Sequence, residues 1–384
     1  MKERPEKASK VSEKDIIELK AEKIIKRASR KVGYDRKSLP GKVKDFLLCA
    51  ALTFLFTLGA AFVGVVAVIW ICMNGPSAKA RELLVSSLKE TSAAGFVAHL
   101  FVPDIEIEHI LFDADDDVVN GDTDKDLIQI PEDIGGNESS GGEQTGENTG
   151  DAEEKDVEVI DVVGPTYNGK LVIVKDPSRV KLGVSGTYGA GFSGQTLETI
   201  VKKYDGLYGV NASGFEDEGG SGSGAVPVGL VVSEGVLLWG DVNTKYDVIG
   251  FDSNNILIID TMTAGEAIER GIRDAMSFGP FLVKNGTPIY KGGGVNPRTA
   301  IGQRADGAVI LAVIEGRQIS SIGATMRDLT NLMLDYGAVN AANLDGGSSS
   351  SLYGNGKYII EGSYIFGTRK IPNAFIVTKK QIVE

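Results

Sequence analysis

The residue best placed for chemistry is Asp345, which follows the apolar run 338–344 and opens the Gly-Gly-Ser run at 346–348. This order predicts a carboxylate at the end of a strand, beside backbone that glycine leaves free to approach a ligand closely. Such a carboxylate can act as a nucleophile or as the base that activates a water molecule. The competing interpretation is an aspartate that only caps a tight turn.

Arginines beside glycine-rich loops form a second group of candidates. Arg298, Arg317 and Arg369 stand in or near such loops, and a guanidinium can hold a phosphate through two parallel hydrogen bonds. Successive backbone N–H groups of a loop can add an anion-binding nest. Any single loop can equally be a plain tight turn. The glycine-rich loops span residues 209–224, 277–286, 291–303, 343–356 and 367–377.

Cysteine and histidine are almost absent from the C-terminal part of the chain. Cys49 and Cys72 both lie in one apolar run, and both histidines, His99 and His109, precede the main acidic stretch. The later region therefore offers no Ser-His-Asp or Cys-His pair, no disulfide and no cysteine-based zinc site. A P-loop motif is also missing, and the net charge of −12 argues against a dedicated nucleic-acid binder. Catalysis here has to rest on carboxylates, arginines, amides and hydroxyls.

Five ordered segments of the chain carry a family resemblance, and the third and fourth together are the most specific. They are NASGF (211–215), GPFLVKNG (279–286), PRTAIGQ (297–303), GATMRDLTNLMLDYGAVNAANLDGGSSS (323–350) and RKIPNAF (369–375). On these segments, residues 158–384 resemble the phosphodiester glycosidase family. That family includes enzymes that remove N-acetylglucosamine from phosphodiester-capped mannose, and bacterial members labelled as exopolysaccharide-related. Residues 77–111 also resemble the juxtamembrane stretch of Gram-positive members.

The resemblance implies roles for individual positions. Asp345 opens a segment that matches the family's Asp-Gly-Gly turn, and Arg298 matches the arginine of its Arg-Thr-Ala-Ile-Gly strand. Asn211 matches the asparagine that opens the first glycine loop. Serine at 213 and 348 departs from the glycine-rich pattern, which loosens the inference about the sugar. The expected catalytic residues are Asp345, Arg298 and Asn211, and the expected substrate-binding residues are Gly346, Gly347, Ser348, Arg317, Arg369 and Gly279.

With these roles, the resemblance implies a hydrolase that cleaves the bond between a sugar anomeric carbon and a phosphodiester. The leaving group is an acidic phosphate ester, so it needs charge stabilisation by arginines more than it needs a proton. Asp345 would supply the carboxylate at the anomeric carbon, and Asn211 would orient sugar hydroxyls or the attacking water. Glu216 and Asp217 could supply a second carboxylate, although an exposed acidic loop is the favoured interpretation of that pair.

Two other functions stay open on the sequence alone. The chain could be a non-catalytic surface module that binds anionic polysaccharide, or a glycosyl-phosphodiester transferase. No residue spacing requires a metal, although carboxylates and amides could hold a divalent cation. The expected partners are a glycan or sugar-phosphodiester substrate and the membrane, with no nucleic acid.

The elements that must position these residues predict an α+β fold with a mixed, largely antiparallel sheet and a few flanking helices. Val- and Ile-rich runs bounded by Gly, Asn and Asp indicate strands at 170–176, 229–240, 255–260, 308–316 and 373–380. Helical patterns are fewer, at 196–204, 263–274 and 325–336. In the last of these, Thr325 and Asp328 form a capping box, and Gly337 is placed to end the helix.

Residues 46–73 form a run of 28 residues without a charge. About 20 apolar residues are enough to cross a bilayer, so the run predicts one transmembrane helix. It is too long, and begins too far from the N-terminus, for a cleaved signal peptide. Residues 26–45 hold eight Lys and Arg against three in residues 74–93. The positive-inside rule therefore places the N-terminus in the cytoplasm and the C-terminal domain outside the cell membrane.

Charge divides the remainder of the chain. Residues 104–161 carry 21 Asp and Glu against 2 Lys, which is typical of a disordered linker. An exported domain without disulfides favours a bacterial surface protein. The expected organisation is a cytoplasmic basic tail (1–45), a transmembrane helix (46–73), a juxtamembrane helical segment (74–112), an acidic linker (113–157) and a phosphodiester glycosidase-like domain (158–384).

Overall fold

The computed structural model describes residues 20, 22–23, 41–91, 95–104, 106–107, 110, 121–131, 156–217, 222–362 and 367–380. Most of the expected tail 1–45 and most of the expected linker 113–157 lie outside these residues. The chain divides into two compact units, Met1–Val68 and Ile69–Glu384. Four antiparallel sheets and six α-helices make up an α+β fold in the described part, which confirms the expected fold class.

Helix α2 (Gly41–Asn74) contains the uncharged run. Its segment Asp45–Asn74 is long and apolar enough to cross a membrane, since 30 residues of helix extend about 45 Å. Large apolar side chains such as Phe54, Leu55 and Phe62 are exposed along it. Such a surface is unfavourable in water and favourable in lipid.

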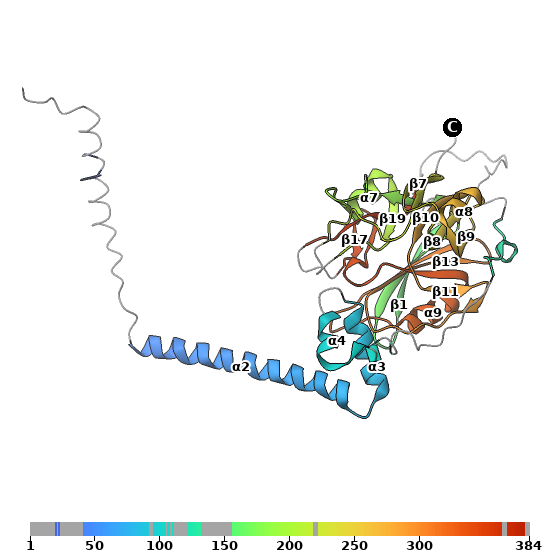
Figure 1. Cartoon of the computed structure of the whole chain (residues 1–384). Coiled ribbons are helices and arrows are strands. Elements are labelled where there is room, and N and C mark those ends of the chain that lie inside the picture. Colours follow the sequence, from blue (N-terminus) through green and yellow to red (C-terminus); the bar gives the residue numbers. More distant parts are fainter. Residues whose placement is uncertain are drawn as a thin grey trace, which may run out of the picture. The chain divides into compact units, whose positions relative to one another are not determined.

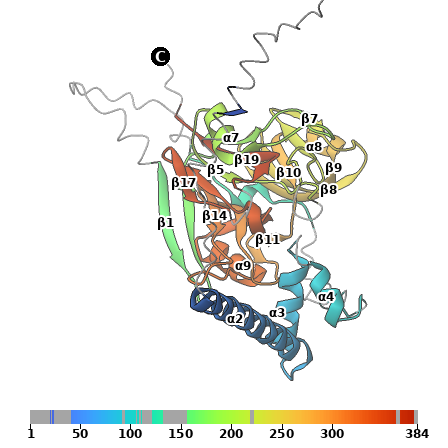
Figure 2. The ribbon, with the colours of Figure 1, turned by 90° about the vertical axis from the view of Figure 1, so that its left-hand side faces the viewer.

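Three of the sheets share one central core, and a helix covers the outer face of each (Figures 1 and 2). The central core draws on all three sheets, for example through Leu311, Phe375 and Ile259. Helix α9 (Met326–Asp335) packs on the seven-stranded sheet, α7 (Leu197–Lys203) on one five-stranded sheet and α8 (Ala264–Glu269) on the other.

The strands pair antiparallel throughout. The seven-stranded sheet runs β1 (Val157–Val163), β2 (Asn168–Val174), β14 (Val309–Ile314), β13 (Arg298–Arg304), β15 (Ala338–Leu344), β11 (Phe281–Lys284), β12 (Thr287–Pro288). The second sheet runs β7 (Val236–Trp239), β6 (Val231–Ser233), β10 (Ile272–Ser277), β8 (Lys245–Asp252), β9 (Leu257–Thr263). The third runs β17 (Lys357–Ile360), β16 (Leu352–Gly354), β5 (Gly206–Asn211), β19 (Asn373–Thr378), β3 (Val180–Val184). The fourth pairs β18 (Lys370–Ile371) with β4 (Gln195–Thr196).

The predicted helix 325–336 is confirmed in detail. Thr325 accepts a hydrogen bond from the Asp328 backbone, and the Asp328 carboxylate accepts one from the Thr325 N–H in return. The predicted helix 263–274 is wrong in its second half. Its chain leaves α8 at Gly271, whose φ of +73° is left-handed, and continues as buried strand β10. Pairing of β10 with β6 on one side and β8 on the other outweighs the local helical pattern.

Residues 121–131 have a defined conformation and pack against the domain, in contrast to the free linker expected over 113–157. The Thr123 backbone and hydroxyl both donate to Asp260, at 2.8 and 3.0 Å. Lys125 forms an ion pair with buried Asp252 at 2.7 Å, and Ile128 is buried under the β8–β9 sheet. These contacts fix residues 121–131 on the domain, because Thr123 and Lys125 bind buried carboxylates and Ile128 packs against apolar side chains.

Two short helices follow α2 in the sequence. Helix α3 (Ala78–Lys89) is capped by Ser77 and carries Val85 and Ser86 on its buried side. Helix α4 (Gly95–Phe101) packs against α3, and their apolar side chains form a small separate core with Met73, Ala98 and Val102. Both views place α3 beside the part of the domain that holds α9 (Figures 1 and 2).

Candidate active site

A cavity of about 470 Å³ brings together eight of the nine residues expected from the sequence. Its floor is the turn that follows β15, and its walls come from loops far apart in the chain. The expected residues that line it are Asp345, Gly346, Gly347, Ser348, Arg298, Arg317, Arg369 and Gly279. Unexpected lining residues include Glu90, Phe278, Asn296 and Asn343.

Strand register explains why Arg298 and Asp345 meet. Strand β13 begins at Arg298, and its antiparallel neighbour β15 ends at Leu344, which lies opposite Thr299. The first residue of one strand and the residue that follows the other therefore stand side by side. The Asp345 N–H donates to the Ala212 carbonyl oxygen at 2.9 Å, which ties the turn to the end of β5.

The Asp345 carboxyl group is unusually easy to protonate. Burial raises its pKa to about 6, and the nearby Asp217 charge acts in the same direction. Hydrogen bonds from the Ser349 side chain and the Gly346 backbone, together with the Arg369 charge, oppose that rise in pKa. The residue still keeps partial exposure through the cavity. A buried carboxyl with a shifted pKa at the floor of a pocket is a typical feature of a catalytic site.

Asn211 lies beneath the cavity rather than in its lining. The residue is 1% exposed, and its Nδ2 donates to the Asp345 carbonyl oxygen at 2.6 Å. Its Oδ1 accepts from the Thr299 hydroxyl at 2.9 Å and the Ser351 N–H at 3.0 Å. The expected contact of Asn211 with sugar or water is therefore corrected. Its carboxamide hydrogen-bonds to the turn at Asp345 and to the residues beside it, so Asn211 positions the turn.

Arg298 is buried and already paired. Its Nη2 lies 2.6 Å from Glu90 Oε2 and donates to the Gly294 carbonyl oxygen at 2.5 Å. Its Nε donates to the Ala324 carbonyl oxygen at 3.2 Å. Glu90 follows the last residue of α3, so a residue from outside the expected domain 158–384 reaches Arg298, the side chain expected to bind phosphate. Sequence reasoning missed Glu90, because no local pattern shows that α3 docks at this loop.

Arg317 forms the neighbouring part of the wall. Its Nη2 lies 3.2 Å from the Thr91 hydroxyl and 3.4 Å from Asn296 Oδ1. Burial and the Arg298 charge lower its pKa, while Glu90 opposes that effect. The guanidinium also lies against Gly347, where a Cβ would stand 3.2 Å from Nη2. Glycine at 347 therefore leaves room for Arg317 over the turn.

Arg369 closes the opposite side. It forms an ion pair with Asp217, and its guanidinium lies over the Phe215 ring at 4.8 Å from the centroid. The acidic loop 216–217 was expected to be solvated, yet Asp217 is 14% exposed in its side chain and lines the cavity. On the next wall, Asn343 Nδ2 donates to the Gly279 carbonyl oxygen at 2.8 Å and so fixes that loop.

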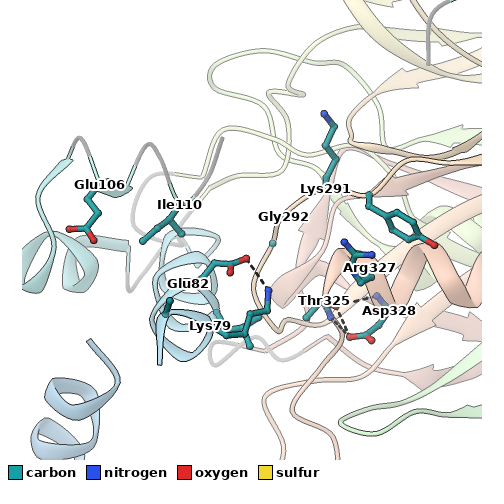
Figure 3. Close-up of a pocket in the computed structure, with 13 residues that line it drawn as sticks. Lys79, Glu82, Glu106, Ile110, Lys291, Gly292, Thr325, Arg327 and Asp328 are labelled. Atoms are coloured by element: carbon teal, nitrogen blue, oxygen red, sulfur yellow. Dashed lines mark hydrogen bonds and ion pairs between the residues drawn. The ribbon is translucent and has the colours of Figure 1, made fainter. Parts of the chain in front are cut away.

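A second cavity, of about 670 Å³, adjoins the first through the shared residues Gly292 and Gly293. Figure 3 shows Lys79 and Glu82 of α3 on one side of it, and Arg327 near the start of α9 on the other. Within the described residues, no group of three or more His, Cys, Asp or Glu is arranged to hold a metal ion.

Comparison with known proteins gives one relative by sequence in the curated set. Over 183 residues the chain is 32% identical to the SPbeta prophage-derived uncharacterized protein YomE of Bacillus subtilis (strain 168). That match covers 43% of this chain and 27% of the relative, so the chain spans about a quarter of the relative's length.

Two solved structures show weaker likeness. The catalytic domain of zebrafish N-acetylglucosamine-1-phosphodiester α-N-acetylglucosaminidase, auto-inhibited by its pro-peptide, matches with a TM-score of 0.49 and 20% identity, over 58% of this chain and 82% of that one. A putative exported protein from Burkholderia pseudomallei K96243 matches with a TM-score of 0.42 and 16% identity, over 55% and 74%.

The family comparison is the most direct. Residues 204–378 match the model of the phosphodiester glycosidase family. That range holds every cavity residue expected from the sequence, from Gly279 to Arg369, and leaves out Glu90. Residues 204–378 of this chain therefore match the phosphodiester glycosidase family.

Proposed function

We propose that this chain is a membrane-anchored glycosidase that hydrolyses sugar-1-phosphodiester linkages outside the cell, in cell-envelope or exopolysaccharide glycans. One observation carries the proposal: eight expected residues from separate loops converge on one cavity, with Asp345 at its floor and arginines in its walls. A volume of about 470 Å³ lies within the range of about 300–1,000 Å³ that is usual for small-molecule sites.

In this reaction the bond between the anomeric carbon and the phosphate oxygen breaks, and its electron pair leaves with the phosphate ester. Water supplies the hydroxyl group that the sugar gains, and the phosphate leaves as a monoester. Asp345 acts at the anomeric carbon, either as the base for water or as a nucleophile released by water afterwards. Arg317 and Arg298 stabilise the charge that grows on the leaving phosphate.

The proposed location rests on charge and length. The segment Asp45–Asn74 can span a bilayer, and its flanking cations favour a cytoplasmic N-terminus. A domain held next to the membrane by α2 meets envelope glycans at high local concentration. Residues of α3 line the second cavity, and Glu90 after it lines the first. The protein should therefore be tested at full length, because a fragment that begins at residue 158 would lack these residues.

The test is incubation of the full-length protein in detergent with an N-acetylglucosamine-1-phosphodiester, with and without a sugar acceptor, and measurement of free sugar. We expect free sugar in both reactions. Asp345→Asn should be nearly inactive, and Arg298→Ala should have a higher KM and a lower kcat than the wild type. The exposed Asp161, changed to Asn, serves as the matched control. Sugar transfer only to the acceptor would indicate a transferase. Binding of anionic polymer without any sugar release would indicate a non-catalytic module.

A further inference from the structure

We infer that Glu90 sets the charge of the phosphate site, so that the site accepts a singly charged phosphodiester and disfavours a doubly charged phosphomonoester. The inference rests on the proposed function, because it concerns how that site separates substrate from product. It assigns a specificity-determining role to a residue at the end of the juxtamembrane helix, outside the residues that match the family model.

The Glu90 carboxylate is surrounded by hydrogen-bond donors that are suited to an anion. Its Oε2 lies 2.6 Å from Arg298 Nη2 and accepts from Asn296 Nδ2 at 2.9 Å. Its Oε1 accepts from the Gly294 N–H at 3.0 Å. One guanidinium, one side-chain amide and one backbone N–H therefore surround a single carboxylate. Such charge-assisted hydrogen bonds are the strong ones, so this carboxylate is held in a fixed place.

The loop at residues 293–295 of the domain has a backbone that fits against α3. The Val295 N–H donates to the Ser87 hydroxyl at 2.9 Å, one helical turn before Glu90. At Gly294 a Cβ would overlap the Ser87 backbone, and at Gly293 it would lie 3.0 Å from Glu90 Oε1. The glycines of this loop thus provide room for α3. Both the glycine loop and helix α3 therefore carry features that fit this contact.

Glu90 forms a wall of the cavity and leaves it open. With α3 seated, Asp345, Gly347 and Arg317 still line a cavity of about 470 Å³. The Glu90 side chain keeps 26% exposure, so its charge faces the space where a ligand would lie. A ligand phosphate beside Arg317 would therefore feel Arg298, Arg317 and Glu90 together.

The charge count favours one negative charge on the ligand. At the proposed phosphate position, Arg298 and Arg317 supply two positive charges and Glu90 cancels one, which leaves one net positive charge there. Across the cavity, the charge of Arg369 is balanced by Asp217, and the negative charge that Asp345 carries above pH 6 stands at the proposed sugar position, where it adds to the repulsion of a second ligand charge. A phosphodiester carries one negative charge, whereas a phosphomonoester carries nearly two at pH 8, since its second pKa is about 6. The second charge gains no further cation and is repelled by Glu90.

The effect of Glu90 should scale with ligand charge. At about 5 Å, one pair of unit charges changes affinity by roughly 4-fold in water-like surroundings and by more than 100-fold at an effective dielectric constant of about 20. For this half-open site we expect about 10-fold per unit of ligand charge. Removal of the Glu90 charge should then strengthen diester binding about 10-fold and monoester binding about 100-fold.

The experiment is calorimetric titration of the full-length protein in detergent at pH 8, with glycerol 3-phosphate as monoester and glycerophosphoglycerol as diester. In the Glu90→Gln variant the ratio of monoester to diester affinity should rise about 10-fold over the wild type. Glu90→Asp keeps the charge and should keep the wild-type ratio. Glu82→Gln, on the same helix but outside the first cavity, should also keep it.

Other results would overturn the inference. An unchanged ratio in Glu90→Gln, or weaker binding of both ligands, would show that Glu90 serves only to hold the loop. Equal tightening of both ligands would show that Glu90 is a simple obstruction. If Glu90→Gln fails to fold, a changed ratio in Glu90→Asp would also contradict the inference. These titrations need no turnover, so they decide on Glu90 even where the wild type releases no sugar and the proposed function fails.

Discussion

Replacement of Asp345 by Asn tests the central carboxyl group through stability as well as activity. The folded-state pKa of Asp345 is raised to about 6, against about 3.9 in an unfolded chain. Below pH 4 both states hold the proton, so the raised pKa has no effect on stability. Between pH 4 and 6 the unfolded state ionises first, so the wild type loses stability as the pH rises. Above pH 6 this loss stays constant.

The magnitude follows from the difference of about 2 pKa units. At 1.36 kcal/mol per unit, ionised Asp345 costs the folded state about 3 kcal/mol, and about 2 kcal/mol if the cavity admits water. Asparagine carries no such charge. The stability of Asp345→Asn relative to the wild type should therefore rise by about 2–3 kcal/mol from pH 4 to pH 8. For a domain of this size, that corresponds to roughly 4–12 °C in Tm.

The assay is thermal unfolding of both proteins in detergent, followed by tryptophan fluorescence at several pH values. The other titrating groups are shared, so the difference between the two proteins isolates Asp345. The same measurement on Asp161→Asn, at an exposed carboxylate, serves as the control. A difference between Asp345→Asn and the wild type that stays flat with pH would refute the raised pKa, and an active Asp345→Asn enzyme would remove Asp345 from the chemistry.

Three further predictions follow from the same contacts. Because Asp345 must be ionised to act as base or nucleophile, kcat/KM should rise with pH through an inflection near 6, and a profile that falls with pH through 6 would instead make Asp345 an acid. Asn211→Ala leaves buried polar partners unsatisfied, so it should lower the free energy of unfolding by about 2–4 kcal/mol, as measured by urea unfolding. In steady-state kinetics it should reduce kcat with no selective rise in KM. Gly294→Ala should displace α3, lower Tm and abolish the charge discrimination by Glu90. Gly186→Ala, where a Cβ meets open space, should have none of these three effects.

Local patterns were enough for part of this protein. The uncharged run 46–73 predicts helix α2 by length alone, because membrane thickness sets the number of apolar residues. The capping box of Thr325 and Asp328 depends on residues three apart and appears as predicted. Seven of the eight expected cavity residues lie in the five short segments, and Arg317 was expected as an arginine near a glycine-rich loop, since a ligand site needs particular side chains on particular loops.

Long-range contacts decided the rest. Residues 263–274 look helical locally, but β10 pairs with strands distant in sequence. Asn211 was expected to face the ligand, and only the approach of Asp345, Thr299 and Ser351 shows that it faces the protein.

The sequence by itself determined the types of group available for catalysis: with no His or Cys after residue 109, the chemistry falls to carboxylates and arginines. Only the tertiary structure decided which of these groups lie together in one cavity. The raised pKa of Asp345 comes from burial, and the pairing of Arg298 with Glu90 spans more than 200 residues of chain. Burial and charge pairing depend on distances in space, and no spacing along the chain encodes those distances.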